Sequence, residues 1–269
     1  MRFLALASDY DGTLAENGYM TAATRTAVER LRATGRKLIL ATGRSLDDLA
    51  QVLFPLDVFD RIVAENGAIL YCPREKRTVR LSPDLPPSLI RELQAKNVEP
   101  LWVGEVILAT RKENAHVIQH ALRRLQLDVE VVVNKQTIML LPAGINKATG
   151  LLAALDDLGI SEERVISVGD GENDTILFEA TGCGAAVANA TEAVKGSADH
   201  VTKGTAGASV KELIDQIIAT DLVELRRCVG GRRRHAVAIA SGGDSARKSG
   251  DLYTSGHAVS RDQDIVGGS

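Results

Sequence analysis

The sequence predicts an α/β protein whose core is a doubly wound parallel sheet, with a smaller unit inserted into that core. Short, unbroken apolar runs such as residues 3–7 and 165–168 alternate with stretches of helical periodicity, which is typical of parallel strands buried on both faces. Between about residues 73 and 142 this alternation gives way to a different pattern, and it then resumes. With 269 residues, 45% of them hydrophobic, the chain can bury one substantial core and a smaller module.

Residues 1–72 are expected to form the first part of the core. Their helical stretches are residues 21–34, which end at Gly35, and residues 45–54, which end at Pro55. Glycine commonly follows a helix because it adopts positive φ, whereas proline cannot continue a helix. The strands of this part are expected at residues 3–7, 37–41, 61–64 and 68–71.

Residues 73–143 are expected to form the inserted unit. A helix followed by two short strands occurs there, and the same order then repeats without a repeat of the sequence. The helices are expected at residues 88–96 and 113–125, and the strands at residues 101–103, 106–110, 129–133 and 137–141. This order predicts a small αββαββ unit.

Residues 144–222 are expected to complete the core, with the alternation of strands and helices restored. The helices are expected at residues 147–158, 175–180, near Glu192 and at 208–222, and the strands at residues 165–168 and 183–187. Residues 223–269 do not continue this pattern, because a cluster of arginines is followed by a stretch rich in Gly, Ser and Asp. That composition predicts a disordered tail. A basic interaction arm and the start of a truncated second domain are the alternatives.

Four carboxylates directly follow two of the expected strands. Asp9 and Asp11 come after the first strand, and Asp170 and Asp174 come after residues 165–168. If these strands are neighbours, the carboxylates meet in one crevice, because the carboxyl ends of parallel strands converge there. Two carboxylates about 4 Å apart repel by roughly 4 kcal/mol at an effective dielectric of about 20, so such a cluster requires a compensating cation. Oxygen ligands suit Mg²⁺, which also takes a substrate phosphate.

Other residues suited to binding phosphate lie between the two acidic loops. The strand at residues 37–41 ends in Thr42, Gly43 and Arg44, directly before a helix that opens with a capping-box pattern. A hydroxyl and backbone N–H groups at such a point can hold phosphoryl oxygens. Lys147 opens the helical stretch after the inserted unit and would bring a cation to the same crevice. Together these residues predict a magnesium-dependent phosphoryl-transfer site.

The same motifs resemble those of the haloacid dehalogenase superfamily of phosphatases. Four motifs occur in order over roughly residues 1–220, namely DYDGT at residues 9–13, the threonine of ATGR, Lys147, and GDGEND at residues 169–174. AENGA at residues 64–68 and AVANA at residues 186–190 are similar to the Cof-like, sucrose-phosphatase-like and archaeal phosphoglycolate-phosphatase-like branch. The resemblance implies a Rossmann-like core and identifies the inserted unit as a cap, which would close over the crevice and select the leaving group.

The resemblance also implies a role for each motif residue. Asp9 would be the nucleophile that forms an aspartyl-phosphate, and Asp11 the general acid and base. Thr42 would hydrogen-bond the transferring phosphoryl group, and Lys147 would neutralise it while positioning Asp9. Mg²⁺ would be held by Asp9, the backbone carbonyl of Asp11, Asp170 and Asp174. The remaining implied residues are those that support the turn or the metal ligands, Gly12, Thr13 and Asn173, and those that bind substrate, Gly43, Arg44 and Asn66.

The predicted function is hydrolysis of a small phosphorylated metabolite of the sugar phosphate or phosphoglycolate type. A phosphomutase of the phosphomannomutase type stays open as an alternative, but it would need several basic residues of the cap directed toward the site. The spacing of those present is typical of a solvated face: Arg111, Lys112, Arg123, Arg124 and Lys135. A non-catalytic regulatory module that uses the arginine-rich tail is a further alternative, although none of the four reactive positions is missing.

Composition limits the classes of partner and compartment. A net charge of −3 gives no reason to expect a nucleic-acid partner. No run approaches the ~20 apolar residues of a membrane span. Cys72, Cys183 and Cys228 are few, odd in number and far apart, which predicts reduced thiols and a cytoplasmic location. Nothing in the sequence indicates an oligomeric state.

Overall fold

The computed structural model describes residues 1–52 and 55–224, all of which belong to one compact unit. The predicted disordered tail lies outside the described residues from residue 225 onward, and so do residues 53 and 54 at the end of the expected helix 45–54. Within the described part of the chain, no helix is both long enough and apolar enough to cross a membrane.

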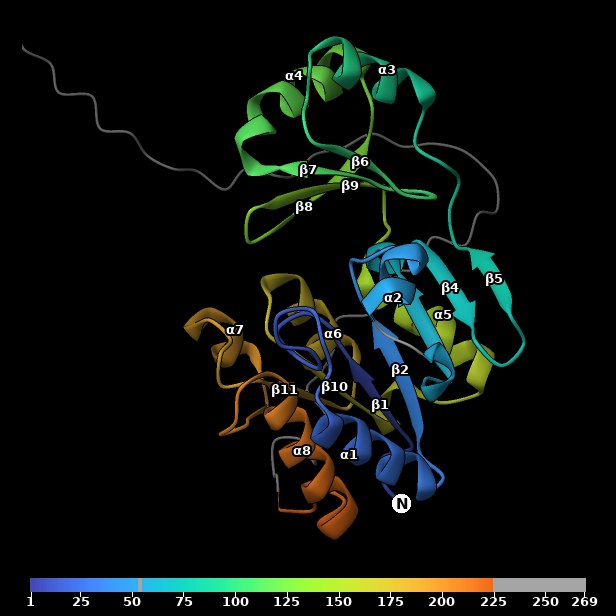
Figure 1. Cartoon of the computed structure of the whole chain (residues 1–269), viewed down its shortest axis with the longest axis vertical. Helices are drawn as coiled ribbons and strands as arrows, with labels where there is room; N and C mark the ends of the chain where they lie inside the picture. Colours follow the sequence, from blue (N-terminus) through green and yellow to red (C-terminus); the bar gives the residue numbers. More distant parts are fainter. Residues whose placement is uncertain (53–54, 225–269) are drawn as a thin grey trace, which may run out of the picture. The chain divides into compact units, whose positions relative to one another are not determined.

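The larger of two sheets contains eight strands in the order β12-β11-β10-β1-β2-β3-β4-β5 (Figure 1). The strands from β12 to β3 are parallel, whereas β4 and β5 are antiparallel to their neighbours. Their bounds are β1 (Ala5–Ser8), β2 (Lys37–Ala41), β3 (Arg61–Ala64), β4 (Ile69–Cys72), β5 (Arg77–Arg80), β10 (Val165–Gly169), β11 (Cys183–Ala186) and β12 (His200–Val201). The α/β fold with a doubly wound, mostly parallel sheet is thus confirmed.

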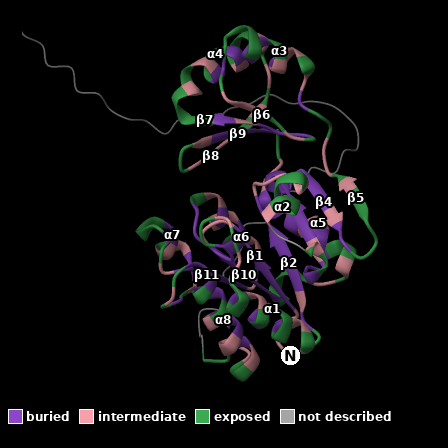
Figure 2. Cartoon of the chain, in the orientation of Figure 1, coloured by how far each residue is buried: buried purple, intermediate pink, exposed green. Residues whose placement is uncertain are grey.

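The strand order reverses its direction between β1 and β10. From β1 the chain proceeds to β2 on one side, and from β10 it proceeds to β11 on the other. Because parallel crossovers are right-handed, their helices cover opposite faces of the sheet. In doubly wound sheets, ligands bind at the carboxyl ends of the strands at this switch point. Every residue of β1 and β10 is buried (Figure 2), which explains their unbroken apolar sequences.

The helices of the large sheet form two packed pairs. α1 (Ala22–Ala33) packs against α8 (Ala206–Thr220), and α5 (Lys147–Leu158) packs against α6 (Thr175–Ala180) (Figure 1). The shorter helices α2 (Leu46–Val52) and α7 (Glu192–Ser197) complete this part of the fold.

The smaller sheet has the order β6-β7-β9-β8 and is antiparallel throughout. Its strands are β6 (Leu101–Val103), β7 (Leu108–Arg111), β8 (Val129–Asn134) and β9 (Thr137–Pro142), and its helices are α3 (Pro87–Ala95) and α4 (Ala115–Leu125). We call residues 87–142 the small module.

Side chains of β9 alternate between two hydrophobic clusters. Ile138 and Leu140 pack with residues of α3 and α4. Met139 and Leu141 belong instead to the hydrophobic core of the large sheet. Because successive side chains of a strand point to opposite faces, one face of the smaller sheet is covered by its own helices and the other packs on the core.

Two strands of the large sheet were not expected from the sequence. β5 has the sequence RTVR and is largely exposed, so it lacks the apolar run that marks a buried strand. β12 has only two residues. The expected boundary at residue 73 assigns residues 77–80 to the inserted unit, whereas in the structure they pair with β4. The remaining domain boundaries stay a prediction.

The cysteines differ from expectation. Cys72 is a free, buried thiol, but Cys183 is disulfide-bonded, and Cys228 lies outside the described residues. The prediction of reduced thiols is therefore wrong at Cys183, because separation along the sequence does not limit separation in the fold. Cysteine usage thus gives no support to a cytoplasmic location.

Candidate functional site

Two acidic loops meet where β1 and β10 end. Asp9 follows β1, and its backbone N–H donates to the carbonyl of Val168 at 3.0 Å, while Asp170 follows β10. Gly12 has a φ of +88°, and a Cβ at this position would overlap the Asp170 carboxylate. Glycine therefore allows both the backbone conformation and the close approach of the two loops.

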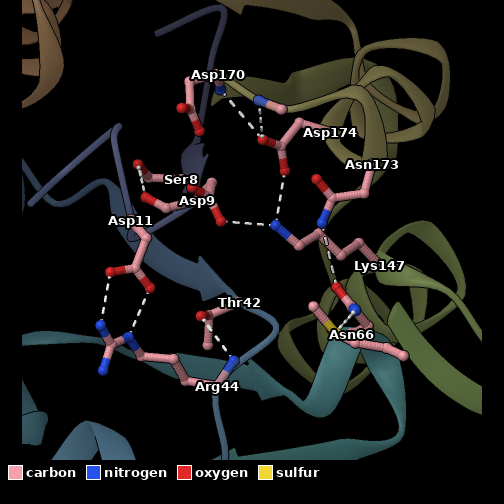
Figure 3. A network of polar contacts seen from close by, with 12 residues as sticks. Ser8, Asp9, Asp11, Thr42, Arg44, Asn66, Lys147, Asp170, Asn173 and Asp174 are labelled. Carbon is pink, nitrogen blue, oxygen red and sulfur yellow. Dashed lines mark hydrogen bonds and ion pairs between the residues drawn. The ribbon is translucent and has the colours of Figure 1, made fainter. Parts of the chain in front are cut away.

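A buried lysine links these loops. Lys147 Nζ donates to Asp9 Oδ1 at 2.6 Å and to Asp174 Oδ1 at 2.7 Å (Figure 3), and all three side chains are buried. Lys147 is the first residue of α5, whose N-cap residue Asn146 accepts hydrogen bonds from two backbone N–H groups of the first turn. The capped helix start thus fixes the position from which Lys147 reaches both loops.

Burial and charge determine the protonation of this cluster. Burial, followed by the charge of Asp174, raises the pKa of Asp9 to about 7, and Lys147 offsets only part of this effect. Burial alone would lower the pKa of Lys147, but the charges of Asp174 and Asp9 outweigh it and the pKa is raised. Burial also raises the pKa of Asp170. The cluster therefore favours a further cation, which would stabilise its carboxylates in the charged form.

The carboxylates fit a hard divalent cation. One oxygen each from Asp9, Asp170 and Asp174 lies within 4.8 Å of the others. Asp174 Oδ2 also accepts the backbone N–H groups of Asp170 and Gly171 at 3.1 and 2.9 Å, so this carboxylate orients the loop in addition to offering a donor. A set made of oxygen atoms alone suits Mg²⁺ rather than zinc or copper.

Asp11 is oriented differently from the other three carboxylates. The guanidinium of Arg44 donates from Nε to Asp11 Oδ2 at 2.6 Å and from Nη2 to Oδ1 at 2.7 Å (Figure 3). This bidentate bond raises the pKa of Arg44. The Asp11 side chain is thus held by Arg44, and its expected metal contact, through the backbone carbonyl, stays a prediction.

Thr42 and Gly43 lie at the end of β2. Thr42 is buried, and its Oγ1 accepts the backbone N–H of Arg44 at 3.1 Å. A Cβ on Gly43 would come 3.1 Å from the Met139 Cε of β9. The end of β2 therefore lies between the acidic loops and the small module, where the sequence places a phosphate-binding turn.

Asn66 and Asn173 lie beside Lys147 (Figure 3). Asn66 has a φ of +51°, which asparagine tolerates better than most residues, and its Oδ1 accepts Asn173 Nδ2 at 3.4 Å. The backbone N–H of Thr13 donates to the carbonyl of Tyr10 at 3.3 Å within the turn after Asp9. Within the described residues, the buried Asn173 Oδ1 and Thr13 Oγ1 have no hydrogen-bond partner.

Sequence reasoning missed two residues that contact the site. The Lys135 side chain is exposed, as the sequence predicts, but its Nζ also lies 3.1 Å from Asp170 Oδ2. Its spacing carries no signal of this contact because Lys135 occupies a turn. Asn189 Nδ2 donates to the carbonyl of Gly12 at 2.8 Å. Asn189 belongs to the AVANA segment, which was recognised only as a family signature.

Comparisons with known proteins place the chain in a family. The sequence profile of haloacid dehalogenase-like hydrolases matches residues 6–125 and 105–214. The chain is 32% identical over 221 residues to the phosphoglycolate phosphatase of Methanothermobacter thermautotrophicus, covering 78% of this chain and 96% of the relative. A 5-amino-6-(5-phospho-D-ribitylamino)uracil phosphatase of Bacillus subtilis is 26% identical over 247 residues, covering 73% of this chain and 91% of the relative.

Solved structures share the fold. A haloacid dehalogenase-like hydrolase from Bacteroides thetaiotaomicron superimposes with a TM-score of 0.67 at 23% identity, covering 80% of this chain and 99% of that one. A sugar phosphatase of subclass IIB superimposes with a TM-score of 0.65 at 21% identity, covering 79% of this chain and 98% of that one.

Proposed function

The chain belongs to the haloacid dehalogenase-like hydrolases and is a phosphoric monoester hydrolase, and from this premise we propose that it is a Mg²⁺-dependent phosphatase that acts through an aspartyl-phosphate on Asp9. The observation that carries the proposal is the buried bridge of Lys147 between Asp9 and Asp174, with Asp170 alongside. In this arrangement the nucleophile Asp9 is held as a carboxylate by the permanent cation Lys147. The metal ligands Asp170 and Asp174 lie next to it.

In the first step, an Asp9 oxygen attacks phosphorus, and the bond to the leaving oxygen breaks as the new P–O bond forms. The ion pair with Lys147 holds the Asp9 carboxylate in one orientation, and the ammonium stabilises charge on the phosphoryl oxygens. The Thr42 hydroxyl and the backbone N–H of Gly43 donate hydrogen bonds to the same oxygens, while the backbone N–H of Arg44 donates to Thr42 Oγ1. Asp9, Asp170 and Asp174 would hold Mg²⁺, which would supply further neutralisation of phosphoryl charge.

Asp11 handles the protons in both steps. In its protonated form it donates a proton to the leaving oxygen. As a carboxylate it then accepts a proton from the water that attacks the phosphoryl group, which releases inorganic phosphate and regenerates Asp9. Arg44 donates to both oxygens of the Asp11 carboxylate, so one of these hydrogen bonds has to break before Asp11 carries the proton, and the other then limits its orientation.

The substrate class that we propose is a small phosphorylated metabolite of the phosphoglycolate or sugar phosphate type. The named relatives support this class because they are phosphatases of small phosphorylated compounds. A phosphomutase would need several cationic residues for a second phosphate. Of the five basic residues considered for that role, Lys135 contacts the site, whereas Arg124 pairs with Glu92 on the small module itself.

The test is phosphate release from a panel of phosphorylated metabolites, with and without Mg²⁺. We expect turnover that depends on Mg²⁺ and that falls to background in Asp9→Asn. Asp215→Asn is the matched control, because the same change is made on α8, where Asp215 pairs with Arg30 and Lys211. Turnover that is unaffected by chelation of Mg²⁺, or that survives in Asp9→Asn, would refute the proposal.

A further inference from the structure

We propose that Lys135 is a specificity-determining residue that pairs with a carboxylate on the leaving group of the substrate. This inference rests on the proposed phosphatase function and assigns a chemical class to the group that departs with the leaving oxygen.

Lys135 is at the tip of a hairpin that reaches the acidic loops. It occupies the turn between β8 and β9, where Asn134 pairs with Thr137, and it has a φ of +55°. A Cβ on Gly171 would come 3.6 Å from Asn134 Oδ1, so the hairpin tip lies against the loop that carries Asp170. Lys135 Nζ reaches Asp170 Oδ2 at 3.1 Å.

We place the leaving group in the cavity beside this lysine, because Asp11 also lines it. The cavity has a volume of about 470 Å³, and its lining includes Asp11, Glu16, Asn17, Lys135 and Asn189. Since Asp11 protonates the leaving oxygen, the rest of the leaving group must extend from Asp11 into adjoining space. Lys147 lines a different cavity of about 190 Å³, whose lining does not include Asp11. Lys135 is therefore the cation on the leaving-group side of the site.

The charges around the cavity favour an anion at Lys135. Arg44 already compensates the carboxylate of Asp11. The Lys135 side chain is 63% exposed and can turn toward a ligand, whereas its partner Asp170 is buried. Mg²⁺ held by Asp170 would compensate the carboxylate that the ammonium leaves. Glu16 is an exposed carboxylate on the same cavity, and its charge opposes an anion. The balance of these two side chains thus sets the preference for carboxylated over neutral leaving groups.

The test compares two substrates that differ in one group, 2-phosphoglycolate and 2-hydroxyethyl phosphate. The measured quantity is the ratio of their kcat/KM values. Wild type is expected to prefer 2-phosphoglycolate, and Lys135→Gln to lower the ratio by roughly 10-fold, mainly through the KM of the carboxylate, because a charge-assisted bond is lost. Lys135→Arg should keep the ratio within about threefold, since it keeps the charge. Glu16→Gln should change the ratio in the opposite direction.

Lys76→Gln is the matched control. Lys76 is also an exposed lysine at positive φ in a turn, but it lies between β4 and β5, so its removal should leave the ratio unchanged. Calorimetric titration of both compounds into the Asp9→Asn variant, with and without Lys135→Gln, measures the same preference without turnover. A ratio that Lys135→Gln leaves unchanged, or a wild type without preference for the carboxylate, would overturn the assignment of Lys135. If the wild-type protein shows no Mg²⁺-dependent turnover of any substrate, the proposed function itself is refuted.

Discussion

Lys147 and Asp11 have opposite environments within a single site. Lys147 is buried, and both of its partners are carboxylates, so its charge is fixed and its position is set by the start of α5. Asp11 is held by a guanidinium but its side chain is 42% exposed, as a group that exchanges protons with a leaving group and with water requires. In the proposed mechanism, the permanent charge of Lys147 thus lies where phosphate would bind, and Asp11 lines the adjoining cavity.

Asp11→Asn is expected to lower kcat/KM, which reports the step that releases the leaving group, by roughly 10²–10⁴-fold for alkyl phosphates, because general acid catalysis is lost. The kcat/KM of p-nitrophenyl phosphate should fall less, since nitrophenolate leaves without a proton. Steady-state kinetics on both substrates measures the difference. An equal loss for both would contradict the role of Asp11 as the acid.

Residues next to the expected strands were identified from the sequence because strand ends in a parallel sheet converge. Asp9, Asp170 and Asp174 are brought together as that rule requires, and Lys147 reaches them from the start of α5. The contact of Lys135 with Asp170 was missed because the two residues are 35 positions apart and meet through a turn. Sequence spacing reports neighbours along a helix or strand, but it does not report which loop a hairpin tip touches.

The start of α5 depends on a glycine in a distant segment. Gly67 has a φ of +110°, and a Cβ there would overlap the backbone carbonyl of Asn146, the N-cap residue of α5. The next residue in the chain after that cap is Lys147. The close packing of these two backbones therefore determines the position of Lys147.

Gly67→Ala should lower kcat/KM at least roughly 10-fold and destabilise the fold by several kcal/mol, because the added methyl group forces α5 to move. Gly35→Ala is the control, because Gly35 has a φ of +87° but open space where the Cβ would lie. This substitution should destabilise the fold by only about 1 kcal/mol, through the strained backbone conformation alone. Urea unfolding and steady-state kinetics measure both effects. Equal effects of the two substitutions would contradict the packing argument.

Asp221, directly after α8, ties the end of that helix to the start of the chain. It accepts the backbone N–H groups of Arg2 and Phe3 and the guanidinium of Arg36. Burial alone would raise the pKa of Asp221, but these hydrogen bonds outweigh it and the pKa is lowered. A carboxyl group whose pKa is lowered by folding stabilises the folded state at pH values above its unfolded-state pKa of about 3.9. This stabilisation is lost as pH falls further.

Asp221→Asn should therefore lower the free energy of unfolding by about 1–3 kcal/mol at pH 7. This difference between variant and wild type should shrink as pH falls below about 4. Asparagine tolerates the positive φ of this position, so backbone strain does not enter. Thermal unfolding of wild type and variant from pH 7 to pH 3 measures the difference, with Asp128→Asn at an exposed position as control. A cost that is independent of pH would contradict the ionic role.

Most helices and strands were predictable because their buried faces require apolar residues at regular positions in the sequence. β2, β3, β6, α5 and α6 have the expected bounds. β5 and β12 could not be found in this way, because one is an exposed charged edge and the other has two residues. The antiparallel end of the large sheet follows from pairing across the sheet, which local periodicity does not encode.

The core and the small module are joined through Glu65. This buried carboxylate accepts the backbone N–H groups of Glu105, Val106 and Ile107 at 2.8, 2.9 and 3.1 Å. A Cβ on Gly104 would come 2.6 Å from Glu65 Oε1, so the loop before β7 is fitted to the carboxylate. The hydrogen bonds hold this loop of the small module to a residue of the core.

Glu65→Gln should increase amide hydrogen exchange at residues 105–107 and cost about 2 kcal/mol of stability, because an amide has one acceptor oxygen in place of two. We also expect a severalfold higher KM for phosphorylated substrates as the module loosens. Glu105→Gln, at an exposed residue of the same loop, is the matched control. Unchanged exchange at residues 105–107 would contradict this account of how the module is attached.

The central claim is that the phosphoryl group passes to Asp9, and the most direct measurement is mass spectrometry of the protein after acid quenching. The Asp11→Asn variant, mixed with p-nitrophenyl phosphate and Mg²⁺, should accumulate one phosphoryl group on the peptide that contains Asp9, because the base for its hydrolysis is missing. The same experiment on a variant that also carries Asp9→Asn should give no phosphorylated peptide. Phosphorylation at another residue, or phosphate release in a single turnover with no phosphorylated protein, would contradict the claim.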